Sequence, residues 1–540
     1  MDINKLTLKE KVCQMVFPSL SYERVKNFFQ SLNELKIILK SYPFGGFIVF
    51  YNNVPDFLET INLVQTESSI PLLIASDIES GVGQIVNGTT FFPNNMALGA
   101  TNNPEFTYLQ GKITAIESRA IGINMAFAPV VDVNNNPDNP IINVRSYGED
   151  VNLVCKMSSA FIKGCKENGL LTTAKHFPGH GDTNVDSHLR LPIINADMNR
   201  LNKIELLPFK SSIKAGVDAI MTAHIAIPKL EENEEIIPAT ISYNIMTKLL
   251  RNELGFNGLI VTDALIMNSI VDEMDFVQAA VKAIKAGCDI ILVPPDPILT
   301  VDGIVNSVVN NDLDEELINQ SVKRIFQTKE KIGLFDDKNI IKSMEDIKDI
   351  INKEEFHKFS ALLSEQSITL VQDKNHLIPI TEHSKIINIV INDDNLENIH
   401  KFWTKQLDDY SNKILTFDLN PSFSVNEIEL IVNQINNFDI VLCPIFSQIK
   451  TWNPDLSLND SLLALLKEIV YKFGDKTIMI AMSNPYLLSE FPDVSTYICT
   501  YSYSPYSIIA VMDAIWGEIP FKGKLPISIP GLYKIGHSWR

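Results

Sequence analysis

The sequence is poor in cysteine, and its six cysteines are scattered along 540 residues with no Cys-x-x-Cys pair. Structural zinc sites and disulfide frameworks place their cysteines in closely spaced patterns. Several of these cysteines lie in apolar segments, as Cys288 does in the run Ala-Gly-Cys-Asp-Ile-Ile-Leu. We therefore expect small buried thiols in a reducing compartment, and neither disulfides nor cysteine metal ligands.

Long apolar runs and a leader-like N-terminus are also missing. Residues Met1–Lys11 are charged and have the pattern of a helix, and no apolar segment of signal-peptide type follows them. No apolar run approaches the roughly 20 residues that cross a bilayer. These features predict a cytoplasmic protein that has no membrane partner.

Basic residues are fewer than acidic ones, 46 against 65, and the formal net charge is −19. A chain with this charge repels nucleic-acid phosphates and anionic lipid surfaces, so neither is an expected partner. Glycine-rich phosphate-binding motifs are missing too. No Gly-x-Gly-x-x-Gly or Gly-x-x-x-x-Gly-Lys follows the first predicted strand, 45–50, which disfavours a nucleotide-binding fold.

Short apolar strands alternate with amphipathic helices through the first 335 residues. Helices separate the predicted strands, which lie at 45–50, 71–76, 125–132, 169–174, 217–223, 258–263 and 288–293. Continuous apolar strands separated by helices indicate a parallel sheet covered on both faces. Seven or eight such units in this length favour a (β/α)8 barrel of TIM type over an open sheet.

The remainder of the chain resumes this alternation after a charged segment. Residues 336–358 are charged and poor in apolar side chains, which predicts a helical linker. We expect a smaller α/β sandwich domain at 359–540, an open sheet with helices on both sides. With 45% hydrophobic residues each domain can bury its own core. Residues 359–540 hold no cluster of titratable groups, so we assign catalysis to the barrel, residues 1–335.

Polar residues collect where the predicted barrel strands end. The residues at or just beyond a carboxyl end are Asp77, Asp132, Lys175, His176, His224 and Asp263. In a barrel these ends meet at one mouth, where the chemistry of this fold takes place. A single residue of this kind is as readily a helix cap or a loop residue, but agreement between several strand ends indicates an active site.

The densest cluster is the segment 172–188, in which three of the nine histidines fall within thirteen residues. Asp186 and His188 are two positions apart, so in an extended loop their side chains point the same way. The carboxylate can then fix the imidazole tautomer and raise its basicity, as a general acid/base near neutral pH requires. The alternative for this pair is two solvent-facing loop residues.

Other members of the cluster have alternative roles as well. Lys175 and His176 can donate hydrogen bonds to substrate hydroxyls, or they can form a structural pair that bonds the following turn. His180 is expected to brace the glycine-rich turn. Asp263 can be a nucleophile, a metal ligand or a cap. If the barrel forms, Asp263 shares its mouth with the histidine loop, which suits a nucleophile with a separate acid.

Residues 175–183 read Lys-His-Phe-Pro-Gly-His-Gly-Asp-Thr, and Asp-Ser-His follows at 186–188. This motif resembles the signature of the β-N-acetylglucosaminidase (β-N-acetylhexosaminidase) branch of glycoside hydrolase family 3. Further segments are similar to that family in the same order, at 8–15, 92–99, 145–148, 221–224, 261–265, 364–370 and 523–526. The resemblance covers nearly the whole chain and implies a barrel followed by an α/β sandwich domain.

The resemblance implies a retaining exo-β-N-acetylglucosaminidase that acts on cell-wall (muropeptide) or chitin-type fragments. Asp263 would be the nucleophile that forms a glycosyl-enzyme intermediate, and His188, oriented by Asp186, would be the acid/base. The residues that would bind the terminal sugar are Asp77, Arg145, Lys175 and His176, with His224 lining the pocket. A small carbohydrate is the implied partner, and no metal or cofactor is implied. No residue pattern indicates an oligomeric state.

Some members of this branch use phosphate in place of water to resolve the intermediate. A neutral histidine does not repel such an anion as a second carboxylate would. A β-N-acetylglucosaminide phosphorylase with the same residues, and with inorganic phosphate as a partner, is therefore the alternative function.

Two further alternatives are less favoured. The family's Asp-x-Glu-Gly-Gly-Arg reads Asp-Ile-Glu-Ser-Gly-Val at 77–82, and the arginine that usually follows closely is missing as well. The loss of a substrate contact motivates a non-catalytic sugar-binding protein, although intact Asp186, His188 and Asp263 favour turnover. A metal-dependent amidohydrolase would need a His-x-His pair after the first predicted strand, and residues 47–52 contain none.

Overall fold

The computed structural model describes residues 3–21, 32–50, 53–187, 190–267, 274–336, 342–392, 397–422, 428–447 and 458–539. The first of two compact units comprises Met1–Phe91, Pro104–Val133 and Cys155–Phe356, and the second comprises Phe92–Asn103, Asn134–Val154 and His357–Arg540. Two segments of the second unit thus come from the part of the chain where the sequence predicts the barrel domain. The predicted domain limits at 335 and 359 stay a prediction.

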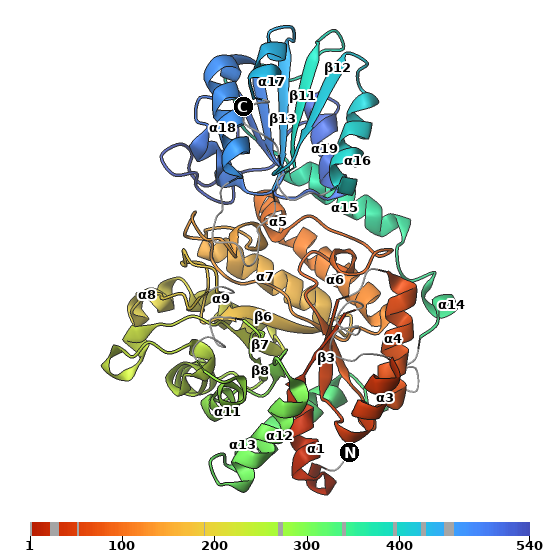
Figure 1. Ribbon diagram of the computed structural model, residues 1–540, viewed down its shortest axis with the longest axis vertical. Helices are drawn as coiled ribbons and strands as arrows, with labels where there is room; N and C mark the ends of the chain where they lie inside the picture. Colours follow the sequence, from red (N-terminus) through yellow and green to blue (C-terminus); the bar gives the residue numbers. More distant parts are fainter. Residues whose placement is uncertain are drawn as a thin grey trace. The chain divides into compact units, whose positions relative to one another are not determined.

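The first unit is built on parallel strands (Figure 1). Seven strands pair in chain order, namely β2 (Ser19–Ser21), β3 (Gly46–Phe50), β4 (Leu73–Ser76), β5 (Met125–Ala126), β6 (Leu171–Phe177), β7 (Ala219–Thr222) and β8 (Leu259–Val261). The ring closes through β9 (Ile291–Leu292), which pairs with β1 (Val16–Phe17), directly before β2. A bridge between Val261 and Ile290 joins β8 to the segment of β9. The predicted (β/α)8 fold is confirmed.

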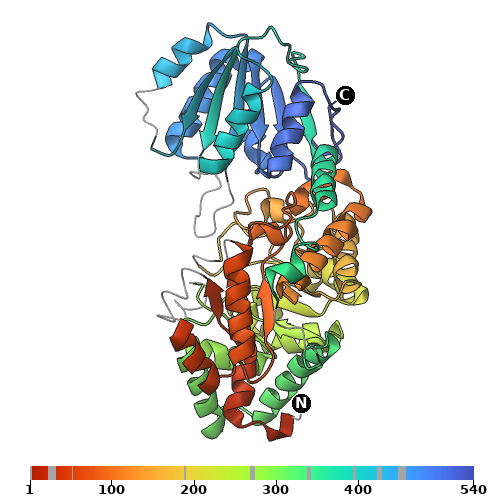
Figure 2. The same cartoon turned by 90° about the vertical axis from the view of Figure 1, so that its right-hand side faces the viewer.

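Helices precede, separate and follow these strands in the chain and cover the sheet (Figure 1 and Figure 2). They are α1 (Leu8–Met15), α3 (Leu32–Ser41), α4 (Val54–Glu67), α6 (Pro104–Ile121), α7 (Val151–Lys166), α8 (Met198–Lys203), α9 (Leu206–Ala215), the π-helical η7 (Asn244–Glu253), α11 (Phe276–Ala286), α12 (Pro297–Val309) and α13 (Glu315–Lys331). Side-chain caps fix several starts: Thr7 forms a capping box on α1, and Asp275 and Asp296 cap α11 and α12. None of the described helices is both long and apolar enough to cross a membrane.

The first barrel strand is Val16–Ser21, and the segment predicted to be the first strand, 45–50, is the second. Pro18 interrupts this strand because proline has no N–H to donate to a neighbour, which hides the pattern in the sequence. The segment 16–24 contains no histidine, so a His-x-His pair is missing after the true first strand as well.

The second unit is a mixed α/β sandwich. Its sheet has the order β10-β15-β14-β13-β11-β12, with bounds β10 (Thr369–Asp373), β11 (Ile386–Asn392), β12 (Ile414–Leu419), β13 (Ile440–Phe446), β14 (Thr477–Ala481) and β15 (Thr496–Cys499). Only β10 among these runs antiparallel to its neighbour. The predicted open sheet is confirmed.

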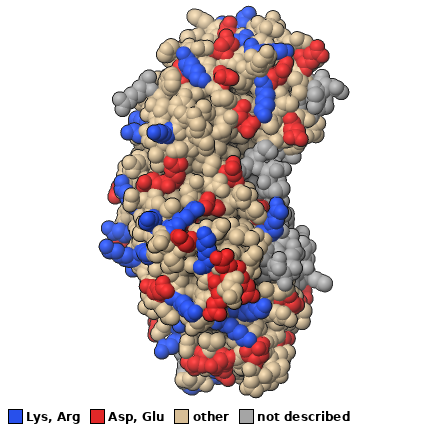
Figure 3. Space-filling view, turned by 90° about the vertical axis from the view of Figure 1, so that its left-hand side faces the viewer, with Lys and Arg blue, Asp and Glu red and all other residues tan. Residues whose placement is uncertain are grey.

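Alternating side chains of this sheet form two separate cores. Ile387 and Ile389 pack in one core with α17 (Ile428–Ile435) and α18 (Asp460–Phe473). Ile386 and Val390 pack in the other core with α16 (Glu397–Asp408) and α19 (Pro505–Ile515). Figure 1 shows these helix pairs on opposite faces of the sheet. On the surface, acidic and basic side chains are intermingled over most of the face in Figure 3.

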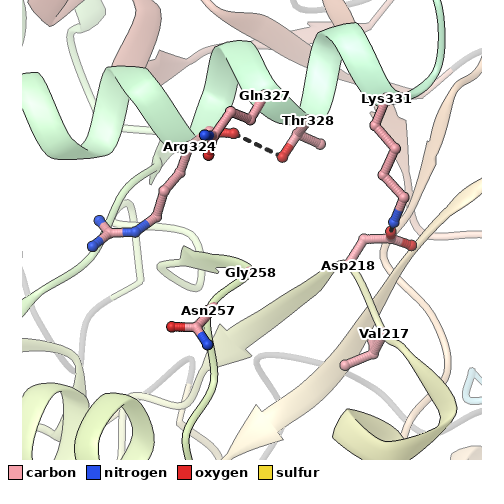
Figure 4. Close-up of a pocket in the computed structure, with 8 residues that line it drawn as sticks. All are labelled: Val217, Asp218, Asn257, Gly258, Arg324, Gln327, Thr328 and Lys331. Carbon is pink, nitrogen blue, oxygen red and sulfur yellow. Dashed lines mark hydrogen bonds and ion pairs between the residues drawn. The ribbon is translucent and has the colours of Figure 1, made fainter.

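The amino ends of β7 and β8 form the floor of the barrel, where a cavity of about 200 Å³ lies against α13 (Figure 4). Lys331 and Arg324 of α13 lie on one side of it, and Asp218 and Asn257 lie on the other. Lys331 forms an ion pair with Asp218. The amino end of a barrel is where residues serve stability, and this floor fits that role.

Candidate active site

The mouth of the barrel, at the carboxyl ends of its strands, holds the polar residues that the sequence predicts there. Asp77 directly follows β4, and Lys175 and His176 lie within the last residues of β6. His224 lies two residues beyond β7, and Asp263 lies two residues beyond β8. Each strand therefore delivers its polar group to the same end of the sheet, as expected from the parallel order.

Lys175 lies between two carboxylates. Its Nζ is 2.7 Å from Asp77 Oδ1 and 2.8 Å from Glu79 Oε1, and its residue is only 2% exposed. A buried ammonium requires such partners, because burial of an unpaired charge is costly. No role was predicted for Glu79, although its position two residues after Asp77 places both carboxylates on one loop.

Where the resembling family has arginines after this loop, the chain packs and turns differently. Val82 is fully buried in the barrel core. Gln84 Oε1 accepts a hydrogen bond from the backbone N–H of Ser80 at 2.8 Å, which closes the turn. Val82 and Gln84 therefore serve the local fold. Among the described residues 77–85 and 171–177, Lys175 is the only lysine or arginine at the mouth.

Asp132 connects His176 to the following loop. Its Oδ2 lies 2.8 Å from His176 Nδ1, and its Oδ1 accepts the backbone N–H of His180 at 2.6 Å. The backbone N–H of His176 also points at this carboxylate, 3.2 Å from Oδ2. An ionised carboxylate only accepts, so this contact assigns the hydrogen of His176 to Nδ1. The sequence marked Asp132 as a strand-end residue but gave no signal of this contact.

His180 braces the loop that leads to Asp186. Its Nδ1 lies 2.9 Å from Thr183 Oγ1 and its Nε2 lies 3.0 Å from Ser187 Oγ. Burial lowers the pKa of His180 to about 4, His176 lowers it as well, and Asp132 and Asp263 act in the opposite direction. The imidazole is therefore neutral near pH 7, as the bracing role predicted for it requires.

Two further contacts hold the same loop. Arg200 pairs with Asp182 inside it and with Glu205 at 3.1 Å. Gly181 is needed for close approach, because a Cβ at this position would lie 1.7 Å from the carbonyl oxygen of Val133. The loop is thus fixed before it reaches the predicted acid/base pair.

The predicted acid/base pair is described in part. Asp186 is buried, with 1% exposure, and its carbonyl oxygen accepts the backbone N–H of Arg190 at 3.2 Å. His188 lies outside the described residues. The contact between Asp186 and His188 therefore stays a prediction.

Asp263 is half-buried, and its carboxylate is oriented by its own loop. Oδ1 accepts the backbone N–H of Ala264 at 2.8 Å, and the backbone N–H of Asp263 donates to Thr222 Oγ1 at 3.3 Å. His224 is fully buried, with Nδ1 2.7 Å from Thr240 Oγ1 and Nε2 3.1 Å from the carbonyl oxygen of Ala264. No spacing in the sequence indicated Thr222 or Thr240.

Arg145 belongs to the second unit. Its Nη1 donates to the carbonyl oxygen of Ile141 at 3.2 Å, and its own carbonyl oxygen accepts from Asn95 Nδ2 at 2.7 Å. Its predicted contact with the sugar stays a prediction. Among the residues that the structure describes, no group of three or more His, Cys, Asp or Glu side chains is arranged to hold a metal ion.

Comparisons with known proteins agree with this architecture. The profile of the glycosyl hydrolase family 3 N terminal domain matches residues 7–328. A β-hexosaminidase A from Pseudoalteromonas piscicida is 31% identical, over 92% of this chain and 91% of its own length. A β-N-acetylglucosaminidase/β-glucosidase from Cellulomonas fimi is 26% identical, over 89% of this chain and 88% of its own.

Solved structures are similar over the same length. A glycoside hydrolase family 3 β-N-acetylglucosaminidase from Paenibacillus sp. str. FPU-7 has a TM-score of 0.85 at 30% identity, and the match covers 97% of this chain and 99% of that chain. A β-glucoside phosphorylase has a TM-score of 0.88 at 25% identity, with 98% and 95% covered.

Proposed function

The chain belongs to glycoside hydrolase family 3, and we propose that it acts there as a retaining exo-β-N-acetylglucosaminidase. The proposed substrates are cell-wall muropeptide or chitin-type fragments that end in a β-linked N-acetylglucosamine. Similarity to known β-hexosaminidases supports this choice of sugar. Cytoplasmic peptidoglycan recycling is the proposed setting.

In the proposed reaction, the Asp263 carboxylate attacks the anomeric carbon while the glycosidic C–O bond breaks. His188, oriented by Asp186, gives its proton to the departing oxygen, so the aglycone leaves as an alcohol. The same histidine then takes a proton from water, which attacks the glycosyl-aspartate and releases the sugar and the free carboxylate. Two inversions give net retention of configuration.

The observation that carries the proposal is that Asp263 and the braced loop 177–187 both follow the carboxyl ends of parallel strands, β8 and β6, that pair with β7. Asp263 lies close enough to His180 for its carboxylate to raise the pKa of this histidine slightly, and His180 Nε2 lies 3.0 Å from Ser187 Oγ, next to Asp186. A half-buried carboxylate on one strand end suits a nucleophile, and a buried carboxylate on a neighbouring loop suits the partner that orients a histidine acid/base.

Sugar binding is proposed for the groups beside them. Lys175 and Asp77 form a donor and acceptor pair at 2.7 Å that can bind adjacent hydroxyls. His176 has its Nδ1 held by Asp132, which orients the ring. Arg145 is the remaining proposed sugar ligand. The complete burial of His224 points to a different role for this residue.

Phosphorolysis is the second candidate, favoured by the likeness to a β-glucoside phosphorylase. The charge balance around Lys175 weighs against it. Lys175 contacts two carboxylates, so its ammonium offers little net attraction to a phosphate anion. We therefore place hydrolysis first.

An aryl β-N-acetylglucosaminide assay with and without inorganic phosphate tests the proposal, and the matching aryl β-glucoside is its control. We expect release of free N-acetylglucosamine at a rate that phosphate does not raise. A sugar 1-phosphate as the main product would make the protein a phosphorylase. Faster turnover of the glucoside would reject N-acetylglucosamine as the preferred sugar.

A further inference from the structure

We propose that His224 is a positioning residue for Asp263 and does not bind the sugar. It holds the backbone on both sides of the Asp263–Ala264 peptide and thereby sets the direction of the Asp263 carboxylate. The proposal rests on the proposed role of Asp263 as the nucleophile. Its starting point is that the His224 residue has no exposed surface, although it lies two residues beyond a barrel strand at the mouth.

A chain of four hydrogen bonds joins His224 to both sides of this peptide. The backbone N–H of Asp263 donates to Thr222 Oγ1 at 3.3 Å, and the hydroxyls of Thr222 and Thr240 lie 2.8 Å apart. Thr240 Oγ1 lies 2.7 Å from His224 Nδ1, and His224 Nε2 lies 3.1 Å from the carbonyl oxygen of Ala264. The chain therefore starts at the N–H of Asp263 and ends at the carbonyl of Ala264.

The direction of these bonds follows from the groups at the two ends. A backbone carbonyl only accepts, so His224 Nε2 carries a hydrogen and donates it to Ala264. The Thr240 hydroxyl is nearer to His224 Nδ1, at 2.7 Å, than to the carbonyl oxygen of Ala223, at 3.2 Å. Thr240 Oγ1 thus lies within hydrogen-bond distance of three groups, the Thr222 hydroxyl, His224 Nδ1 and the Ala223 carbonyl oxygen, while His224 Nε2 carries the hydrogen that the Ala264 carbonyl accepts.

The clamped backbone controls the carboxylate directly. The Asp263–Ala264 peptide lies between the two held groups, and its N–H donates to Asp263 Oδ1 at 2.8 Å. A rotation of this peptide would carry Oδ1 with it and turn the carboxylate. Nucleophilic attack depends on such alignment, and a displacement of about 1 Å can cost about 100-fold in rate.

The segment that carries His224 also bonds the loop that returns from the predicted acid/base. The backbone N–H of Ala226 donates to the carbonyl oxygen of Pro192 at 2.8 Å, and the N–H of Ile194 donates to the carbonyl oxygen of Ala226 at 2.9 Å. The segment 224–226 therefore contacts the Asp263 loop through His224, and it contacts residues 192–194, which follow the predicted acid/base, through Ala226. It can fix the spacing between the nucleophile and the acid/base.

Variants of His224 and Thr240 test the proposal. His224→Phe removes both ring hydrogen bonds, and Thr240→Val removes the hydroxyl with little change of shape. Thr240→Ser keeps the hydroxyl and is the matched control. For the first two we expect kcat/KM to fall by about 100-fold. The loss should be the same for poor and activated aryl leaving groups, because attack by Asp263 is impaired and proton donation is not. Thr240→Ser should retain most of the parent activity.

Two further readouts separate positioning from other roles. The inhibition constant of the product N-acetylglucosamine should stay within about twofold, since His224 would make no sugar contact. Amide hydrogen exchange in the peptide 259–267 should become faster in Thr240→Val. Thr222 Oγ1 accepts the N–H of Asp263, and in this variant it loses the hydroxyl of Thr240 that fixes its position.

Several results would overturn the proposal. Product binding that weakens in step with kcat/KM would make His224 a sugar ligand. Activity of both His224→Phe and Thr240→Val within about threefold of the parent would show that no clamp is needed. Unchanged exchange of the peptide 259–267 would reject the hydrogen-bond chain itself. Turnover by an Asp263→Ala variant would instead reject the proposed nucleophile, while the exchange result would still decide whether the clamp exists.

Discussion

The mouth and the floor of the barrel both contain buried carboxylates, and they differ in how these groups are satisfied. On the floor, the Asp289 carboxylate is bound by Arg251, by Arg324 at 2.8 Å and by the backbone N–H of Ile260 at 2.8 Å. At the mouth, the Asp132 carboxylate is bound by two backbone N–H groups and by His176 Nδ1. Guanidinium groups neutralise the floor carboxylate, whereas amides and an imidazole orient the mouth carboxylate.

Each end also holds a buried lysine. Lys175 at the mouth lies within 2.8 Å of two carboxylates. Lys329 on α13 has no exposed surface and donates to Gln14 Oε1 at 2.7 Å, and burial lowers its pKa to about 7. The same residue type is a paired cation in one place and a poorly solvated amine in the other.

This contrast teaches that residue type at a strand end does not by itself indicate catalysis. Asp218 and Asp289 precede β7 and β9, and their partners tie helix α13 to the barrel. Asp263 follows β8, is half-buried and is held by backbone groups that set its direction. The floor groups therefore stabilise, and we infer that the mouth groups react.

Removal of the Asp263 carboxylate at the mouth should give the largest effect on activity. For Asp263→Ala we expect kcat with an aryl β-N-acetylglucosaminide to fall on the order of 10⁴-fold, since the covalent step loses its nucleophile. The unfolding midpoint should change little, because the Asp263 residue is only half-buried. Steady-state kinetics and urea unfolding check this pair of results. Undiminished turnover would contradict the nucleophile assignment.

The matching change on the floor should have the reverse pattern. Asp289→Asn leaves Arg251 and Arg324 without their carboxylate, and we expect a loss of about 3–5 kcal/mol in the free energy of unfolding. The kcat per folded molecule should stay at the parent value. Urea unfolding and active-site-normalised kinetics measure the two quantities. A large fall in kcat of the folded variant would mean that the floor takes part in the reaction.

The smallest effect is expected at Lys329. Its folded-state pKa, about 7, lies below the ordinary 10.5, so the unfolded chain binds the proton more tightly. Stability is therefore lost as the pH falls from about 10 to 7, and the penalty is complete below that window. We expect Lys329→Met to gain about 1–2 kcal/mol near pH 7, after the lost bond to Gln14 is counted.

Urea unfolding at two pH values checks the Lys329 prediction. The gain of Lys329→Met over the parent should shrink at pH 10. The unfolded lysine then gives up its proton at a smaller free-energy cost, so burial of the neutral amine destabilises the parent less. Lys323→Met, on an exposed position of the same helix, is the control and should show no pH-dependent gain. An equal gain at both pH values would attribute the effect to packing.

The sequence predicted the barrel and its mouth because apolar strands and polar strand ends are local patterns. Strand β6 is buried at all seven positions, so its composition leaves little ambiguity. The first strand escaped prediction because Pro18 interrupts a short pairing segment. The segment Asn134–Val154 groups with the second unit through contacts with residues far along the chain, such as Asn134 with Tyr486 at 2.7 Å.

The candidate site divides in the same way. Asp263, Lys175 and His176 could be found because each ends a strand or lies in a dense motif. Thr240 could not, because it lies 16 residues from His224 in a connecting segment, and a hydroxyl there carries no pattern. The role of His224 depends on burial and on a carbonyl 40 residues away, which only the folded chain brings together.

Trapping the glycosyl-enzyme tests the assignment of the mouth most directly. An Asp186→Asn variant with an activated aryl β-N-acetylglucosaminide should form the intermediate quickly, since this leaving group needs no acid, and should hydrolyse it slowly for want of a base. Quenching in acid, digestion with pepsin and mass spectrometry should place one N-acetylglucosaminyl group on Asp263. A label on another residue, or a burst of aryl release with no covalent label, would contradict the assignment of Asp263 as the nucleophile.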